Sequence, residues 1–478
     1  MSDSTGNTSP LRALPSVDAL LRTPEARLLI ERVGAERLAN LARTVTTELR
    51  AKLQTEARDS ESANGSHTRE ALLTEAVRRL ELACERDARS GLRRVINATG
   101  VVLHTNLGRA PLAEAARRAV ADEAARYCTL EYDAEAGTRG RRGEHVERLL
   151  SELTGAENAL VVNNCAAAAL LVLTVLAKGG TGLVSRGELV EIGGDFRVPD
   201  VMAESGTRLL EVGTTNRTRL SDYERAIDTD TRLLMRVHTS NYRIVGFTST
   251  PSLSELARLA HEKGLLLYED AGSGALVDLS GYGLEGEPVI SESIRCGADV
   301  VTFSGDKLMG GAQAGIIVGR GEIVERLRRH PLYRAMRADK LALAALQATL
   351  EIYRRGAQLQ EIPVLQALSL TPEELEKRAR SFLSKSGEQR GLSSLRLEII
   401  AGESAIGGGA APTAHLRTFL IALSHDSLSP DELGQSLRRG NPPVVPRIAE
   451  DRLLLDLRTV AEDEEAELLK ALASLPAA

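Results

Sequence analysis

The chain of 478 residues has no tryptophan, and aromatic residues make up only 3% of it. Its four cysteines (Cys84, Cys128, Cys165 and Cys296) form no CxxC pair, which excludes a zinc-finger spacing and a dense disulfide framework. The longest strongly apolar run, residues 166–177, is shorter than the roughly 20 residues that a membrane helix needs. The N-terminal stretch MSDSTGNTSP lacks the basic and apolar blocks of a signal peptide. These absences predict a cytoplasmic protein with no membrane segment.

Positive charge is not in excess either. The chain has 60 Lys+Arg against 66 Asp+Glu, a formal net charge of −6, which argues against a protein coated in positive charge for non-specific nucleic-acid binding. Only eight of the basic residues are lysines and 52 are arginines, so a lysine inside a glycine-rich turn is notable. The 43% of hydrophobic residues is near the globular average and excludes a wholly disordered chain.

Residues 1–90 are predicted to form a small helical module. After a polar arm over residues 1–15, the order Thr23-Pro24-Glu25 is typical of a helix start, and apolar residues then recur at helical spacing as far as Val45. A second helix is expected over residues 68–89, after a polar linker. The charges of the module balance, so its pattern alone favours a packing or oligomerisation role.

Residues 91–345 are predicted to form a large α/β domain, because short apolar runs alternate with helical patterns. We expect a mostly parallel sheet with strands over residues 160–162, 182–185, 209–212, 233–238, 265–269, 300–303 and 316–318. Residues 346–478 are predicted to form a smaller α+β domain. In open sheets of this kind, ligands bind at the carboxyl ends of the strands.

Three of the predicted strands end in residues that suit one cofactor. Lys307 follows the strand over 300–303 in the sequence FSGDKLMGG, where a Schiff-base lysine would be closely wrapped by small residues. Asp270 ends an earlier strand and could pair with a pyridinium nitrogen. Asn163 and Asn164 join a strand to a helix whose free N–H groups could bind phosphate, with Ser304 as a further phosphate contact. Each feature alone also fits a structural role, but their joint order is typical of fold-type I pyridoxal-phosphate enzymes.

Eight stretches of the sequence resemble the bacterial selenocysteine synthase family, L-seryl-tRNA(Sec) selenium transferase. They are Arg94–Leu112, Leu130–Asp133, Val162–Asn164, Glu211–Arg217, Val237–Tyr242, Ser304–Lys307, His330–Lys340 and Leu453–Thr459. The resemblance extends from about residue 14 to 470. It departs from the family at Cys165, where another Asn is usual, and at Met309 and Ala312, which replace Leu and Pro.

The resemblance implies conversion of L-seryl-tRNA(Sec) to L-selenocysteinyl-tRNA(Sec) by pyridoxal-phosphate-dependent β-elimination, through an aminoacrylyl-tRNA intermediate and with selenophosphate as the selenium donor. Lys307 would bind the cofactor and take the Cα proton, and Asp270 would keep the ring nitrogen protonated. Asp306 would either protonate the leaving hydroxyl or be a structural acid. His238 would lie near the cofactor or be a hydrogen-bonded core histidine.

The resemblance also implies partners. Arginine binds a small polyanion in a forked geometry, and the family's donor-binding arginines correspond to Arg109, Arg334 and Arg337. The last two are three residues apart, so one helix would place both on one face. Arg139 and Arg142 are further candidates for this pocket or for the tRNA end. Residues 1–90 would bind the tRNA. The chain would form a homo-oligomer, a ring of dimers with sites shared between chains.

Two other hypotheses fit parts of the pattern. One is a pyridoxal-phosphate lyase or aminotransferase that acts on a free amino acid or an amino-sugar acid, which would not need residues 1–90. The other is a non-catalytic tRNA-binding or assembly protein, against which the presence of both Lys307 and Asp270 argues.

Overall fold

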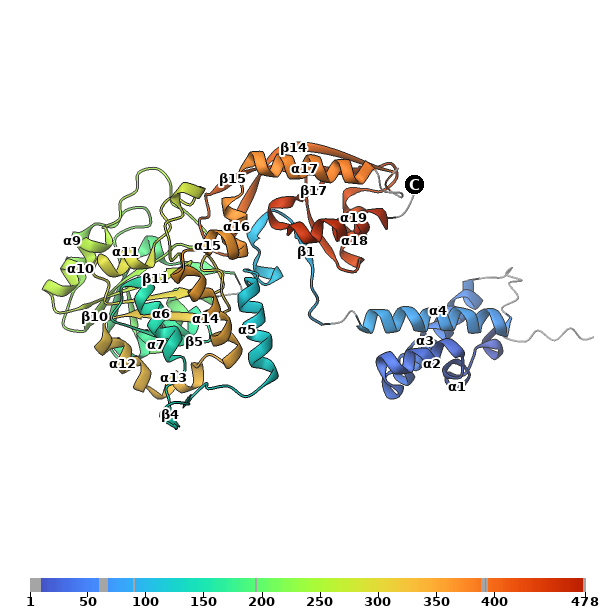
Figure 1. Cartoon of the computed structure of the whole chain (residues 1–478), viewed down its shortest axis with the longest axis horizontal. Helices are drawn as coiled ribbons and strands as arrows, with labels where there is room; N and C mark the ends of the chain where they lie inside the picture. The colour runs from blue at the N-terminus through green and yellow to red at the C-terminus, as the bar shows by residue number, and fades with distance from the viewer. Residues whose placement is uncertain are drawn as a thin grey trace, which may run out of the picture. The chain divides into compact units, whose positions relative to one another are not determined.

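The computed structural model describes residues 10–59, 68–88, 91–193, 196–387, 392 and 394–475. Contacts within the chain define two compact units, Met1–Arg94 and Val95–Ala478, which are described separately (Figure 1). The expected loose arm and polar linker lie largely outside the described residues. The further division near residue 345 stays a prediction, and helix α14 (Lys340–Arg354) runs through that position.

The first unit is helical, as predicted. It contains α1 (Val17–Leu21), α2 (Pro24–Val33), α3 (Ala35–Asp59) and α4 (Arg69–Ala88), preceded by a 3₁₀ turn at Pro10–Ala13. Thr23 caps α2 by accepting the Ala26 N–H at 3.3 Å, with Pro24 in the first turn. The single apolar pattern that continues to Val45 is in fact two helices, because Gly34 has a φ of 79°, which an α-helix cannot contain.

The second unit contains the predicted, mostly parallel sheet. Its seven strands have the order β5-β13-β12-β11-β10-β6-β9, and only the pairs that involve β13 are antiparallel. All seven predicted strands are present, as β5 (Asn158–Val162), β6 (Thr181–Ser185), β9 (Arg208–Val212), β10 (Thr231–Val237), β11 (Leu266–Gly272), β12 (Val300–Ser304) and β13 (Gly315–Gly319).

Helices cover both faces of this sheet (Figure 1). Alternate residues of one strand pack into different cores: Ile316 and Val318 enter one core and Ile317 the other. The first core contains residues of α6 (Glu144–Thr154), α10 (Leu253–Glu262), α11 (Ile290–Arg295) and α14. The second contains residues of α7 (Cys165–Leu176), α8 (Val198–Ser205) and α12 (Gly321–Arg329). Burial on both faces explains why the inner strands are largely apolar, whereas the edge strand β9 is mostly exposed.

A second sheet has the order β1-β16-β17-β15-β14-β2. Its strands include β14 (Leu395–Gly407), β15 (His415–His425) and β17 (Arg452–Asp456), which pack with α17 (Pro372–Gly387), α18 (Pro430–Arg439) and α19 (Glu465–Ala473). Sequence analysis missed β16 (Val444–Ala449), which contains a proline. It also missed that β1 (Ile96–Ala98) and β2 (Val101–Leu103) pair with β16 and β14, so residues early in the chain complete a C-terminal sheet.

The remaining elements are shorter. They are α5 (Glu114–Ala125), β3 (Tyr132–Asp133), β4 (Thr138–Arg139), β7 (Glu191–Ile192), β8 (Phe196–Arg197), α9 (Leu220–Ala226), α13 (Pro331–Met336), α15 (Gln358–Glu361), α16 (Pro363–Ser369) and 3₁₀ turns at 105–107, 186–188, 280–282, 457–459 and 462–464. Among the described residues, no helix is both long enough and apolar enough to cross a bilayer.

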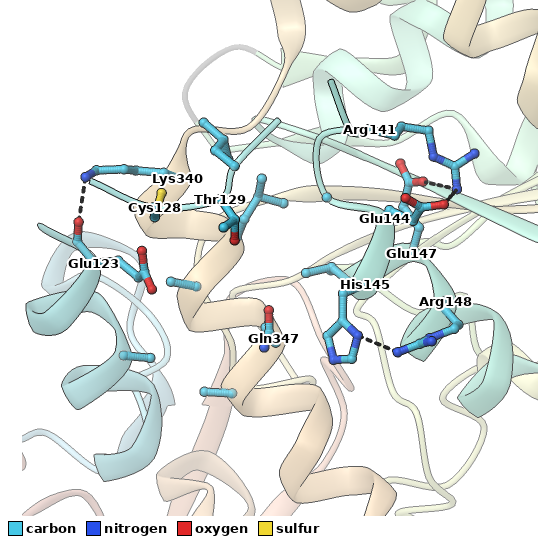
Figure 2. Close-up of a pocket in the computed structure, with 18 of the residues that line it drawn as sticks. Glu123, Cys128, Thr129, Arg141, Glu144, His145, Glu147, Arg148, Lys340 and Gln347 are labelled. Carbon is cyan, nitrogen blue, oxygen red and sulfur yellow. Dashed lines mark hydrogen bonds and ion pairs between the residues drawn. The ribbon is translucent and has the colours of Figure 1, made fainter. Parts of the chain in front are cut away.

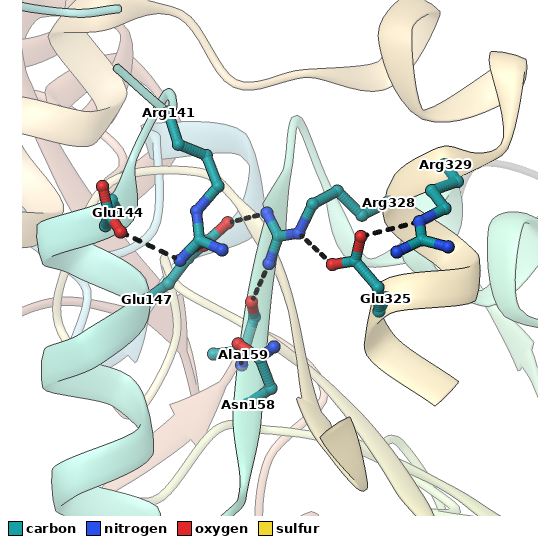
Figure 3. A network of polar contacts seen from close by, with 8 residues as sticks. All are labelled: Arg141, Glu144, Glu147, Asn158, Ala159, Glu325, Arg328 and Arg329. Carbon is teal, nitrogen blue, oxygen red and sulfur yellow. Dashed lines mark hydrogen bonds and ion pairs between the residues drawn. The ribbon is translucent and has the colours of Figure 1, made fainter. Parts of the chain in front are cut away.

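A buried ion pair joins α6 to α12 (Figure 3). Glu147, whose side chain is 2% exposed, accepts a hydrogen bond from Arg328 Nη1 at 2.8 Å, and Arg328 also donates to the carbonyl of Ala159 at 3.1 Å. Burial raises the pKa of Glu147 in spite of this partner. Loss of Arg328 would leave this buried carboxylate with only the more exposed Arg141, whose Nη2 lies 3.4 Å from Glu147 Oε2.

Replacement of Arg328 by Met is expected to destabilise the second unit by about 3–5 kcal/mol, because it removes one partner of this buried pair. Urea unfolding followed by circular dichroism measures the loss. Arg329→Met is the matched control, since Arg329 pairs with the same Glu325 as Arg328 but its side chain is 78% exposed. We expect this control to change stability by less than about 1 kcal/mol. Equal effects of the two substitutions would contradict the prediction.

Candidate active site

A cavity of about 280 Å³ lies where several strands of the large sheet end. Its lining brings together most of the residues that the sequence singled out for cofactor chemistry: Arg109, Asn164, His238, Asp270, Ser304, Asp306 and Lys307. These residues follow or end β2, β5, β10, β11 and β12. The parallel strands of the large sheet end at one edge, which brings together the residues from β5, β10, β11 and β12. Arg109 follows β2 of the second sheet and is joined to them by its ion pair with Asp306.

Lys307 is the buried amine of this cavity. It is 4% exposed and follows β12 in a turn closed by a hydrogen bond from the Gly310 N–H to its carbonyl at 2.9 Å. Burial lowers the pKa of Lys307, which the nearby Arg109 lowers further and the carboxyls of Asp270 and Asp306 partly restore. A lowered pKa provides more of the neutral amine, the form that attacks an aldehyde.

Asp270 lies near the end of β11, and one of its carboxylate oxygens accepts a hydrogen bond within the chain. Oδ1 accepts the Gly272 N–H at 3.2 Å, and the thiol of Cys165 lies 3.8 Å from it. Oδ2 accepts no hydrogen bond within the described part of the chain and is available to a donor in the cavity. Burial raises the pKa of Asp270, while the charge of Lys307 opposes that rise. A cationic donor such as a pyridinium N–H would stabilise the ionised carboxylate.

The start of α7 forms another side of the cavity. Asn164 caps the helix by accepting the Ala167 N–H at 2.8 Å, and Cys165 and Ala166 line the cavity. Burial raises the pKa of Cys165, so its thiol is a packing group and a weak donor to Asp270. Asn163 is not part of this lining; it is exposed, and its N–H donates to the Met336 carbonyl at 2.8 Å.

This set of residues fits pyridoxal 5′-phosphate. A buried amine can bond to the aldehyde, and Asp270 Oδ2 can accept the ring N–H. The N-terminus of α7 and the hydroxyl of Ser304 can hold a phosphate. Among the described residues, no group of three His, Cys, Asp or Glu side chains is suited to a metal ion, so the structure shows no metal site that would compete with the cofactor.

His238 follows β10 and contacts a carboxylate that sequence analysis missed. Its Nδ1 accepts the Ser240 N–H at 3.3 Å, so Nε2, which lies 3.5 Å from Glu287 Oε1, carries a proton. The side chain of Glu287 is 4% exposed. Nothing in the sequence around Glu287 links it to His238, because the two residues lie on different loops.

Arg109 is held in the cavity by Asp306. Its Nη1 donates to Asp306 Oδ2 at 2.9 Å, and Arg109 has a φ of 61°, which is unusual for a residue with a side chain. Asp306 therefore fixes the guanidinium of Arg109 beside Lys307. An ion-paired carboxylate is a poor proton donor, so this contact favours the structural role expected for Asp306 over the acid role.

The other candidate arginines do not line this cavity. Glu131 accepts hydrogen bonds from Arg142 at 2.8 Å, Arg139 at 3.0 Å and Arg337 at 3.1 Å. The bonds from Arg142 and Arg139 lower the pKa of Glu131.

The expectation that one helix carries Arg334 and Arg337 is wrong: α13 ends at Met336, and Arg337 has extended backbone (φ −60°, ψ 136°) that bridges to Val162. Arg334 lies on α13 and is exposed.

A larger cavity, of about 790 Å³, lies among α5, α6 and α14. Figure 2 shows its polar lining, in which Lys340 donates to the Glu123 carbonyl and Arg148 contacts His145. None of the residues that sequence analysis singled out for the cofactor lines it. The smaller cavity around Lys307 is therefore the candidate active site.

The chain is similar to known proteins over nearly its whole length. Residues 95–461 match the family described as L-seryl-tRNA selenium transferase, and residues 11–50 match the family described as selenocysteine synthase N terminal. The L-seryl-tRNA(Sec) selenium transferase of Geobacter sulfurreducens is 49% identical over 465 residues, 97% of this chain and 98% of that protein. The protein of the same name from Hyphomonas neptunium is 47% identical over 466 residues, 96% of this chain and 98% of that protein.

Among solved structures, D-glucosaminate-6-phosphate ammonia-lyase matches with a TM-score of 0.56 and 23% identity, over 81% of this chain and 96% of that chain. This likeness concerns the fold, which is that of fold-type I pyridoxal-phosphate enzymes, as predicted. The family match and the near full-length relatives favour the transferase over the lyase and aminotransferase alternatives. Both units of the chain match, and the second contains the cavity around Lys307, so the chain belongs to the L-seryl-tRNA selenium transferase family.

Proposed function

We propose that this enzyme converts L-seryl-tRNA(Sec) to L-selenocysteinyl-tRNA(Sec), with selenophosphate as the selenium donor. The observation that carries the proposal is the buried Lys307 beside Asp270 in one cavity of a chain that matches this family over residues 95–461. Bound pyridoxal phosphate supplies an electron sink for the negative charge that develops at the serine Cα.

Each residue of the cavity would have a separate role in the reaction. Lys307 would hold the cofactor, and its neutral amine would take the Cα proton of the bound serine. Asp270 Oδ2 would keep a proton on the ring nitrogen, and the N-terminus of α7 with Ser304 would hold the phosphate. His238 would contact the cofactor. Arg109, fixed by Asp306, would provide a cationic group for the reaction.

The cluster of Glu131 with Arg139, Arg142 and Arg337 is proposed to bind the oxyanion of selenophosphate, with Arg334 nearby. Arg337 supports this role, because its Nε is buried and has no hydrogen-bond partner among the described residues. An incoming oxyanion would supply the missing acceptor. Since the cluster lies outside the cavity around Lys307, we propose that a second subunit brings the two together in a ring of dimers.

The first unit is proposed to bind the tRNA. Its four helices form a core of their own, with Leu38, Val45, Leu80 and Cys84 buried between them. Removal of residues 1–60 alone would expose the buried face of α4, so the informative deletion is residues 1–94. We expect this deletion to weaken tRNA binding by roughly tenfold or more while cofactor uptake stays unchanged. Filter binding with labelled tRNA(Sec) measures the effect, and unchanged affinity would refute the role.

The test of the proposed function is direct. The cofactor-loaded protein is supplied with seryl-tRNA(Sec) and selenophosphate, and the product is analysed for selenocysteinyl-tRNA(Sec). We expect the product only when both substrates are present. Selenocysteine formed from free serine, but not from the charged tRNA, would contradict the proposal and support the alternative of an enzyme for free amino acids.

A further inference from the structure

A glycine turn from the C-terminal sheet reaches the amino group of Lys307. The turn follows β14 and consists of Gly407, Gly408 and Gly409, whose φ angles are 75°, 62° and 76°. The Ala410 N–H closes it by donating to the Gly407 carbonyl at 3.1 Å. A Cβ atom at Gly409 would lie 3.5 Å from Lys307 Nζ and 3.3 Å from Ser240 Cβ. The backbone of the turn therefore borders the reacting amine.

Glu287 fixes this turn to the rest of the cavity. Its Oε1 accepts the N–H of Ala411, two residues after Gly409, and the same oxygen lies 3.5 Å from His238 Nε2. Burial opposes ionisation of Glu287, but its hydrogen bonds with His238 and Ala411 lower its pKa. The carboxylate is therefore ionised at neutral pH, and its negative charge lies next to His238 and to the backbone at Ala411.

The groups around Lys307 Nζ determine where each substituent of the serine Cα can lie. The Cα proton must face Nζ, which removes it, and the β-carbon must face the cationic side of the cavity, where Arg109 lies. The acyl group is the third substituent, and the glycine turn is a side of Nζ that presents backbone without a side chain. That side offers backbone and the negative charge of Glu287, which disfavours a free carboxylate but not a neutral ester.

We propose that the Gly407–Gly409 turn, held by Glu287, is the subsite for the ester-linked acyl group of the aminoacyl substrate. The absence of a side chain at Gly409 leaves room for the ester beside Lys307. The charge of Glu287 makes the subsite selective for an esterified amino acid over a free one. This inference rests on the proposed function, because it specifies how that same site recognises its substrate.

The test compares serine methyl ester with free serine as probes, and binding is followed through the absorbance of the bound cofactor. We expect the unmodified enzyme to bind the ester roughly tenfold or more tightly than free serine. Gly409→Ala should weaken ester binding by roughly tenfold while cofactor uptake is retained. Glu287→Gln should reduce the preference for the ester by improving the binding of free serine.

Gly356→Ala is the matched control for the glycine substitution. Gly356 has a φ of 73°, close to that of Gly409, but a Cβ there would meet nothing within 4 Å. The two variants should therefore have similar melting temperatures, since both introduce the same backbone strain. Equal ester binding by the two variants would overturn the proposal. So would loss of cofactor uptake in Gly409→Ala, because the turn would then merely support Lys307.

This experiment is independent of selenium transfer. If the enzyme formed no selenocysteinyl-tRNA(Sec) but still bound the ester in preference to serine, the proposed function would fail and the ester subsite would stand. If selenium transfer occurred and Gly409→Ala bound the ester as Gly356→Ala does, the subsite would fail and the function would stand.

Discussion

Replacement of Lys307 by alanine is expected to abolish formation of selenocysteinyl-tRNA(Sec), with a fall in kcat on the order of 10³-fold or more. The substitution removes the amine that bonds to the cofactor and takes the Cα proton, and the cavity has no second lysine to replace it. Product formation is measured with charged tRNA. Cofactor retention after gel filtration is measured by absorbance, and it should fall in parallel.

Lys178→Ala is the control, because Lys178 is exposed and lies just after α7. It should retain both cofactor and activity. A Lys307→Ala protein that keeps its covalently bound cofactor would show that another amine has this role and would refute the assignment.

The same variant tests whether two subunits share one site. Lys307→Ala and Arg337→Ala proteins should each be inactive, although Arg337→Ala should keep its cofactor. Dissociation and reassembly of an equal mixture should restore activity to about a quarter of the unmodified level, since half of random dimers are mixed and each has one intact site. No recovery in reassembled mixed dimers would place the arginine cluster and Lys307 in one subunit's site.

Replacement of Asp270 by asparagine is the second large effect that we expect. The amide cannot hold a proton on the ring nitrogen as a carboxylate does, so kcat should fall by about 10²–10⁴-fold. Cofactor uptake should persist, because Lys307 remains. Asp278→Asn, at an exposed aspartate whose Oδ1 accepts the Ser280 N–H at 2.8 Å, should leave kcat unchanged. A kcat for Asp270→Asn within a few-fold of the unmodified enzyme would contradict the role.

The same substitution should change the pH dependence of cofactor uptake. The negative charge of Asp270 raises the pKa of Lys307, so its removal should lower that pKa further. Uptake requires the neutral amine, and its rate should therefore reach its plateau at a lower pH in Asp270→Asn than in the unmodified protein. A plateau displaced to higher pH would contradict the electrostatic coupling of the two residues. The rate of absorbance change after cofactor is mixed with the apoprotein measures it.

Local sequence patterns predicted the large sheet well because most of its strands are buried on both faces. Each of the seven strands contains a short apolar run, and the residues that follow them include Asn164, His238 and Lys307. The same reasoning failed where a proline interrupts a strand, as at β16, and where a single glycine ends a helix inside a continuous apolar pattern, as at Gly34. A pattern of apolar residues has no information about the sign of a φ angle.

Contacts between distant segments could not be predicted in this way. Glu131 gathers Arg139, Arg142 and Arg337, and Glu287 connects His238 to the backbone at Ala411. Glu131 lies in the family-like stretch Leu130–Asp133, but nothing in that stretch indicates its partners, and Glu287 lies in no such stretch. Sequence analysis did not single out the glycine triplet at 407–409, and only the tertiary structure shows that it reaches Lys307.

The sequence by itself determined the class of fold and the family, and it singled out Lys307 as the candidate cofactor-binding residue, because strand periodicity and short motifs are local properties of the chain. The scarcity of lysine made position 307 conspicuous, and the resemblance identified the chemistry. The tertiary structure decided which residues share a cavity. It placed Arg109 beside Lys307 and left Arg139, Arg142 and Arg337 outside, because the side chains that meet depend on strand order and on the loops between elements.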